Sequence, residues 1–97
     1  MAAYLVGRMT ITDVGRYARY KERTPAIVAS YGGRFLARGG RRLTLEGPED
    51  ERRIVLVEFA SVKDAEAFYH SPAYRAARDM REGAATGMEL VVVEGVE

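Results

Sequence analysis

The sequence predicts an α+β domain with the element order β-α-β-β-α-β, a four-stranded antiparallel sheet and helices on one face of that sheet. Four short runs are rich in β-branched and aromatic residues, and two longer segments carry apolar residues at helical spacing. Glycine-rich or polar turns separate these segments. Within 97 residues, this order corresponds to the split βαβ, or ferredoxin-like, arrangement.

The first half of the chain predicts one strand and one helix. Residues 3–11 are apolar and β-branched enough for a strand, and Asp13 or its neighbour Thr12 can cap the helix that follows. Apolar residues near one side predict a helix over residues 14–30, ended by a pair of glycines. Pro25 interrupts this segment, so we expect a kink or a break there.

The middle of the chain predicts a hairpin. Residues 34–38 form its first strand, which we expect to continue over residues 42–45 after a bulge or close backbone approach at the two intervening glycines. Residues 53–59 form the returning strand after a polar turn. Right-handed connections place strand 53–59 beside strand 3–11 in the middle of the sheet, and we expect these two strands to run parallel.

The last third predicts helical turns and a final strand. Ser61 can cap a helix that continues through Tyr69, and Ser71 followed by proline begins further helical turns through Met80. Residues 88–94 are the last strand. No repeat or linker divides the chain, so we expect one domain over residues 1–97.

Composition argues against several classes of function. The chain has 15 basic and 14 acidic residues, a balance that offers no electrostatic footprint for nucleic acid. It has no cysteine and one histidine, so we expect no metal site, and no nucleotide-binding motif indicates a cofactor. With no signal-like segment and no apolar run long enough to span a membrane, we expect a cytoplasmic protein that does not contact membranes.

Alternation along the strands divides their side chains between two faces of the sheet. One set is entirely apolar and is expected to pack under the helices: Leu5, Gly7, Met9, Phe35, Ala37, Val55, Val57 and Phe59. The other set mixes apolar and charged residues: Tyr4, Val6, Arg8, Arg34, Leu36, Arg38, Ile54, Leu56 and Glu58. Two such mixed faces packed together would cover their apolar residues, which predicts a homodimer in the form of a closed or nearly closed barrel.

Three charges on the mixed face suggest a site. With parallel central strands, Arg8 and Glu58 would lie toward the same end, and the hairpin would bring Arg38 near Glu58. The cluster is either a structural ion-pair network or a set of anchors for an anionic or carbonyl-bearing ligand. Tyr20 and Tyr31 are candidates for the rim of that ligand site. No catalytic residue can be chosen from the sequence.

His70 is the only histidine in the chain and therefore a candidate general base, but its place at a helix end, where an imidazole complements the helix dipole, favours a structural role.

Several segments resemble a known family. The run YGGRFLARGG at residues 31–40, the segment from Glu58 to Tyr74 and the closing LVVVEG at residues 90–95 are similar, in this order and spacing, to the domain of unknown function 1330 family. The resemblance covers nearly the whole chain. It implies a dimeric α/β barrel, in a superfamily that includes cofactor-free monooxygenases, isomerases and small stress proteins. His70 stands where the family pattern commonly has a small acidic or amide residue.

These observations lead to one functional expectation with two alternatives. The expected function is a homodimeric small-molecule-binding protein, with cofactor-free isomerisation or oxygenation of a small organic substrate as its chemistry if it is an enzyme. The alternatives are a stress-associated binding module without turnover, and an accessory subunit whose dimer surface is itself the function. The sequence does not identify the ligand.

Overall fold

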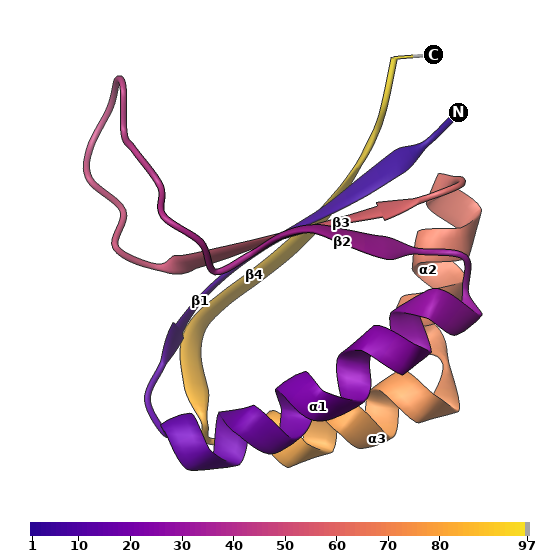
Figure 1. The fold of residues 1–97 in the computed structure, drawn as a ribbon, viewed down its shortest axis with the longest axis horizontal. Coiled ribbons are helices and arrows are strands. Elements are labelled where there is room, and N and C mark those ends of the chain that lie inside the picture. The colour runs from indigo at the N-terminus through magenta and orange to yellow at the C-terminus, as the bar shows by residue number, and fades with distance from the viewer. Residues whose placement is uncertain (97) are drawn as a thin grey trace.

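The computed structural model describes residues 1–96 and has four strands and three helices in that range. Figure 1 shows all three helices on one side of a twisted sheet, which confirms the predicted arrangement. The elements are β1 (Ala3–Ile11), α1 (Val14–Ser30), β2 (Arg34–Arg38), β3 (Arg53–Phe59), α2 (Val62–His70), α3 (Pro72–Arg81) and β4 (Ala85–Glu94). The last strand begins three residues earlier than the sequence predicts.

The sheet has the strand order β2-β3-β1-β4, and every neighbouring pair is antiparallel. The expected parallel pairing of β1 with β3 is therefore wrong. Helix α1 carries the chain from β1 to a parallel position for β2, and the hairpin then reverses β3 into the gap between them. In this register Tyr4 lies opposite Glu58, whereas Arg8 lies opposite Ile54.

Side-chain caps determine where each helix begins. The Asp13 carboxylate accepts the backbone N–H of Arg16 at 3.0 Å, and Ser61 Oγ accepts the N–H of Asp64 at 3.1 Å. Ser71 Oγ accepts the N–H of Tyr74 at 3.1 Å and so begins α3, in which the proline after Ser71 occupies the first turn. The predicted caps are confirmed.

Helix α1 runs through Pro25 without a break, so of the two expected outcomes, a kink or a break, the break is wrong. Proline has no N–H to donate to the carbonyl four residues earlier, which belongs to Lys21. Two other donors replace it: Thr24 Oγ1 donates to that carbonyl at 3.3 Å, and the Arg38 guanidinium donates to it from β2. The freed carbonyl is therefore satisfied, and the helix continues.

Strand β2 ends at Arg38 and does not continue over residues 42–45, because residues 39–52 form a long loop that projects from the sheet (Figure 1). Its bulge lies within the strand, where Phe35 pairs with Val57 but Ala37 pairs with Leu56. The extra residue reverses the alternation from that point. Ala37 is consequently exposed on the mixed face, and Arg38 turns toward the helices.

Apolar residues of β1 and β3 pack under the helices as predicted. The buried core of the described chain contains Ala3, Leu5, Met9, Tyr17, Tyr20, Val28, Val57, Phe59, Ala65, Phe68, Tyr74, Ala77 and Ala84. Phe59 is 1% exposed and packs against Phe68, with the ring centroids 5.2 Å apart. No helix of residues 1–96 covers the other face (Figure 1), where Leu36, Val91 and Val93 are 43%, 57% and 53% exposed.

The turn after α1 brings the backbone directly against the core. A Cβ at Gly33 would lie 2.6 Å from Phe59 Cε1 and 2.9 Å from Val28 Cγ1, both on buried side chains. Because neither side chain can move freely, we expect Gly33→Ala to lower the free energy of unfolding by about 1–3 kcal/mol. Urea denaturation measures the change.

Gly40→Ala is the matched control, since a Cβ there meets nothing within 4 Å. Equal stability of the two variants would show that the contact between Gly33 and Phe59 is not tight.

Candidate functional site

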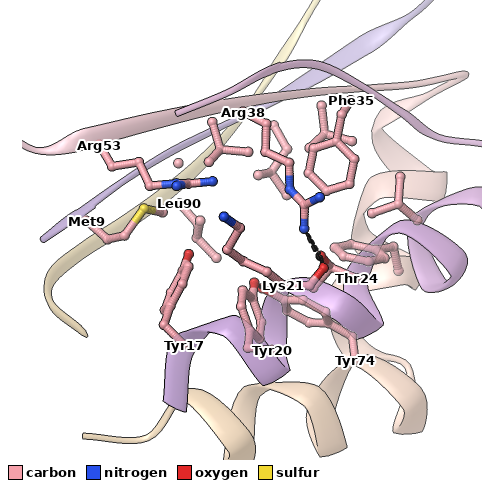
Figure 2. Close-up of a pocket in the computed structure, with 16 residues that line it drawn as sticks. Met9, Tyr17, Tyr20, Lys21, Thr24, Phe35, Arg38, Arg53, Tyr74 and Leu90 are labelled. Atoms are coloured by element: carbon pink, nitrogen blue, oxygen red, sulfur yellow. Dashed lines mark hydrogen bonds between the residues drawn. The ribbon is translucent and has the colours of Figure 1, made fainter. Parts of the chain in front are cut away.

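A cavity lies between α1 and the sheet, and Figure 2 shows its lining. The space between atoms, its open side included, is about 470 Å³, of which about 40 Å³ can hold the centre of a water molecule. That is room for a few waters, or for a small ligand if the side chains at the open side move. The lining residues are Leu5, Gly7, Met9, Tyr17, Tyr20, Lys21, Thr24, Val28, Phe35, Arg38, Arg53, Val55, Val57, Phe68, Tyr74 and Leu90.

A glycine at the centre of the sheet keeps part of this space open. Gly7 lies opposite Val55 on β3 and Leu90 on β4, on the face turned toward α1. A Cβ there would lie 2.9 Å from Leu90 Cδ2 and 3.4 Å from Met9 Cε. Any side chain at this position would therefore extend into the cavity.

Arg38 enters the cavity because of the bulge in β2. Its Nη2 donates to Thr24 Oγ1 at 3.1 Å as well as to the Lys21 carbonyl, and its guanidinium carbon lies 4.6 Å from the centroid of the Phe35 ring. These contacts hold the side chain across the space between β2 and α1 (Figure 2). The cation is therefore fixed in place by uncharged groups.

Arg53 enters the cavity from β3, next to a glycine that makes room for it. Its guanidinium carbon lies 5.9 Å from the centroid of Tyr17, and a Cβ at Gly39 would lie 2.6 Å from that carbon. Gly39 also has a φ of 72°, which side-chain-bearing residues rarely adopt. The Nε of Arg53 is buried and has no hydrogen-bond partner among the described residues.

Tyrosine hydroxyls form the wall of the cavity on the helix side. The hydroxyls of Tyr20 and Tyr74 are 2.7 Å apart in a buried hydrogen bond. Burial raises the pKa of the Tyr20 hydroxyl far above its ordinary value, and the neighbouring Tyr74 raises it further. Burial also raises the pKa of Tyr17, with Arg53 acting in the opposite direction. The hydroxyls of Tyr17 and Tyr20 are thus neutral hydrogen-bonding groups at physiological pH.

The residues predicted to bind a ligand do not form one cluster. Tyr20 and Arg38 line the cavity, but Arg8 and Glu58 lie on the other face of the sheet and toward opposite ends of β1 and β3. Antiparallel pairing separates Arg8 from Glu58, and the bulge removes Arg38 from their face. The expected grouping of three charges is therefore wrong.

Of the three candidates outside the cavity, Glu58 and Tyr31 have structural partners. Glu58 Oε1 accepts a hydrogen bond from Nε of Arg34, directly opposite on β2, at 2.8 Å. Tyr31 lies outside the cavity and packs against Phe68, with the ring centroids 6.4 Å apart.

Sequence reasoning missed the other charged residues of the cavity. Arg53 shares the alternation of the apolar set on β3, and that alternation alone assigns it to the helix face. Lys21 lies one helical turn from Tyr17 and one residue after Tyr20, so helical spacing also indicated its position. Nothing in the sequence pattern located the bulge that adds Arg38.

Other parts of the described chain offer less chemistry. Among residues 1–96, no group of three His, Asp or Glu side chains could hold a metal ion. His70 is exposed and lines, together with Glu66, a groove that reaches β4. None of the helices in that range has the length and apolar character needed to cross a membrane.

The fold resembles several solved structures. A protein of unknown function from Rhodopseudomonas palustris aligns with a TM-score of 0.79 and 21% identity, over 99% of this chain and 83% of that one. SnoaB, a cofactor-independent oxygenase from Streptomyces nogalater, gives 0.65 and 15%, over 99% and 94%. A dimeric ferredoxin-like protein of unknown function from Jannaschia sp. CCS1 gives 0.65 and 16%, over 98% and 100%. These likenesses confirm the ferredoxin-like fold.

A family model described as "Domain of unknown function (DUF1330)" matches residues 2–96, which covers the segments that carry the resemblance. No curated protein matches the chain.

We predict that the hydrogen bond from Arg38 to the Lys21 carbonyl stabilises the folded protein, because Pro25 has no N–H to donate to that carbonyl. We expect Arg38→Met to lower the free energy of unfolding by about 2 kcal/mol, since it removes charge-assisted hydrogen bonds. In a Pro25→Ala background the helix amide can bind that carbonyl, so the same substitution should cost less by at least about 1 kcal/mol. Denaturation of the four proteins in this double-mutant cycle measures the difference.

The cycle cancels the loss of the contact between Arg38 and Phe35, because that contact is removed equally in both backgrounds. An equal cost of Arg38→Met with and without Pro25 would show that the carbonyl does not depend on the guanidinium.

Proposed function

Because this chain belongs to the family described as Domain of unknown function (DUF1330), its activity has to be inferred from its own geometry, and we propose that it binds a small organic molecule in the cavity between α1 and the sheet. The observation that carries this proposal is the lining itself. Aliphatic and aromatic side chains form most of the wall, and a few cationic and hydroxyl groups converge on the space (Figure 2). Such a combination is typical of ligand sites, in which apolar contacts bind the ligand and polar groups orient it.

Cofactor-free turnover of the bound molecule, by isomerisation or oxygenation, is the second candidate function. Isomerisations and oxygenations that begin with loss of a proton beside a carbonyl form electron-rich enolates, and a cation in a poorly hydrated cavity stabilises such a species more than it would in water. The cavity provides those cations, and SnoaB shows that a protein of this fold can be a cofactor-independent oxygenase. A compound that binds in the cavity but is recovered unchanged would favour the binding module without turnover.

We also propose that two copies pack through the face of the sheet that no helix of residues 1–96 covers. This surface carries Tyr4, Val6, Leu36, Ile54, Leu56, Val91 and Val93. Contiguous apolar surfaces of this kind commonly mark protein interfaces. The dimeric protein from Jannaschia has the same fold and supports this choice of partner.

The ligand proposal predicts a specific effect on one methionine. Met9 lines the cavity, whereas Met88 lies in the separate groove near His70. With methyl-labelled methionine, we expect phenol, benzamide or benzoate to shift the NMR signal of Met9 and to leave that of Met88 in place. In Gly7→Val, whose new side chain fills the cavity, the shift of Met9 should disappear.

Gly40→Val is the matched control, because it adds the same side chain in a loop outside the cavity. The proposal fails if none of the three probes moves the Met9 signal, or if Gly7→Val remains folded and still shows the shift.

The dimer proposal is tested by sedimentation at micromolar concentration, where we expect the wild-type chain to migrate as a dimer. Leu56→Arg places a charge in the middle of the uncovered face and should produce monomers, because an unpaired cation is costly to bury. Val14→Arg adds the same charge at an exposed site on α1, away from the sheet, and should remain dimeric. A folded wild-type monomer would contradict the proposal.

A further inference from the structure

We propose that the cavity selects a small organic carboxylate, with the carboxylate bound between Arg53 and Lys21 and the apolar body packed against the aromatic and aliphatic wall. The inference rests on the proposed function, since it specifies the class of molecule that the same cavity takes. It rests on the positive charge of the lining and on the hydrogen bonds that each of its three cations already makes.

The lining is cationic without compensation. Lys21, Arg38 and Arg53 all end in the cavity (Figure 2), and no carboxylate of residues 1–96 is among the lining groups. The ion pairs within the described chain join Arg34 to Glu58, and Arg52 to Asp50 and Glu89, so they involve none of the three cations. Like charges gathered in a partly desolvated space repel one another, and a bound anion relieves that repulsion.

Neighbouring arginines show that this arrangement is local. Arg52 projects to the other face, where it donates to Asp50 at 2.7 Å and pairs with Glu89 at 2.9 Å. Arg53 projects into the cavity, where no acidic partner is present among the described residues. Two consecutive residues of one type thus differ in whether the chain supplies their counter-ion.

The three cations differ in what they can still bind. Arg38 already donates to the Lys21 carbonyl and to Thr24, so it chiefly contributes charge and support. Arg53 has a buried Nε without a hydrogen-bond partner in the described chain. The ammonium group of Lys21 extends into the space between the two guanidiniums (Figure 2). Arg53 and Lys21 are therefore the two cations of the lining whose side chains make no hydrogen bond within the described chain.

The shape of the space favours a carboxylate on an apolar body. A guanidinium and a carboxylate are both planar, so two N–H groups of the guanidinium can donate to the two oxygens of one carboxylate. The rest of the wall includes Phe35, Val57, Phe68 and Leu90, which suit a hydrocarbon or aromatic portion. Such a ligand would provide the missing acceptors and also cover this apolar wall.

The experiment compares ligands that have nearly the same shape but different charge. Benzoate is paired with benzamide, and the smaller crotonate with crotonamide. The smaller pair shows whether the larger compounds fail to bind only because of their size. Each compound is titrated into the wild-type protein at neutral pH while the methyl signal of Met9 is followed, with Met88 as the internal reference. We expect at least one carboxylate to bind roughly tenfold more tightly than its amide, and this preference to weaken as salt is added.

Lysine variants provide a matched control, because the chain has only two lysines, Lys21 and Lys63. Lys21→Met should reduce the preference for the carboxylate severalfold. Lys63→Met, at an exposed site on α2, should leave it unchanged. A preference that survives in Lys21→Met would overturn the assignment of that ammonium group.

The remaining outcomes separate this inference from the proposed function. If carboxylate and amide move Met9 with equal affinity, the cavity binds small molecules but does not select anions, so only the inference fails. If no member of either pair moves Met9, both the inference and the proposed function fail. The central comparison uses the wild-type chain, so it does not depend on any variant folding.

Discussion

The hydrogen bond between the Arg38 guanidinium and the Lys21 carbonyl joins the two layers of this fold across the cavity. It depends on two local irregularities. Pro25 leaves the carbonyl without its helical donor, and the bulge in β2 turns Arg38 from the uncovered face to the helix face. Each irregularity alone would be unfavourable, because one removes the backbone donor of a helix carbonyl and the other would bury a charge. Together they form one contact that supports both the helix and the cavity wall.

The same contact organises the electrostatics of the site. By occupying Arg38 with uncharged acceptors, the fold keeps a cation in the cavity without placing an acidic residue beside it. The absence of a side chain at Gly39 makes room for Arg53 to enter the cavity from β3. The absence of a side chain at Gly7 leaves space on the sheet side of the cavity. Three cations without an acidic partner in the described chain consequently line the helix side of the sheet, while the ion pairs of Arg34 and Arg52 lie on the other side.

Local signals in the sequence predicted the elements well. Asp13, Ser61 and Ser71 act through hydrogen bonds within three residues, so their caps could be assigned from the sequence, and the family resemblance agreed with the resulting order. The wrong predictions concern features that depend on residues far away in the sequence. The continuity of α1 through Pro25 depends on Arg38, a residue from another element, and the position of the bulge depends on the register with β3. The charge cluster expected from Arg8, Arg38 and Glu58 failed because it required both strand direction and alternation to be right.

Strand β4 lies at the edge of the sheet and carries exposed valines, which would favour misassembly with other chains. An exposed edge with the continuous apolar run of residues 90–93 is a template for pairing with strands of other molecules. Glu89 and Glu94 stand at the two ends of that run. Charges in these positions act as gatekeepers, because stacking identical strands would bring like carboxylates together. The edge can therefore remain strongly apolar, while the flanking glutamates oppose fibrillar stacking of newly made chains.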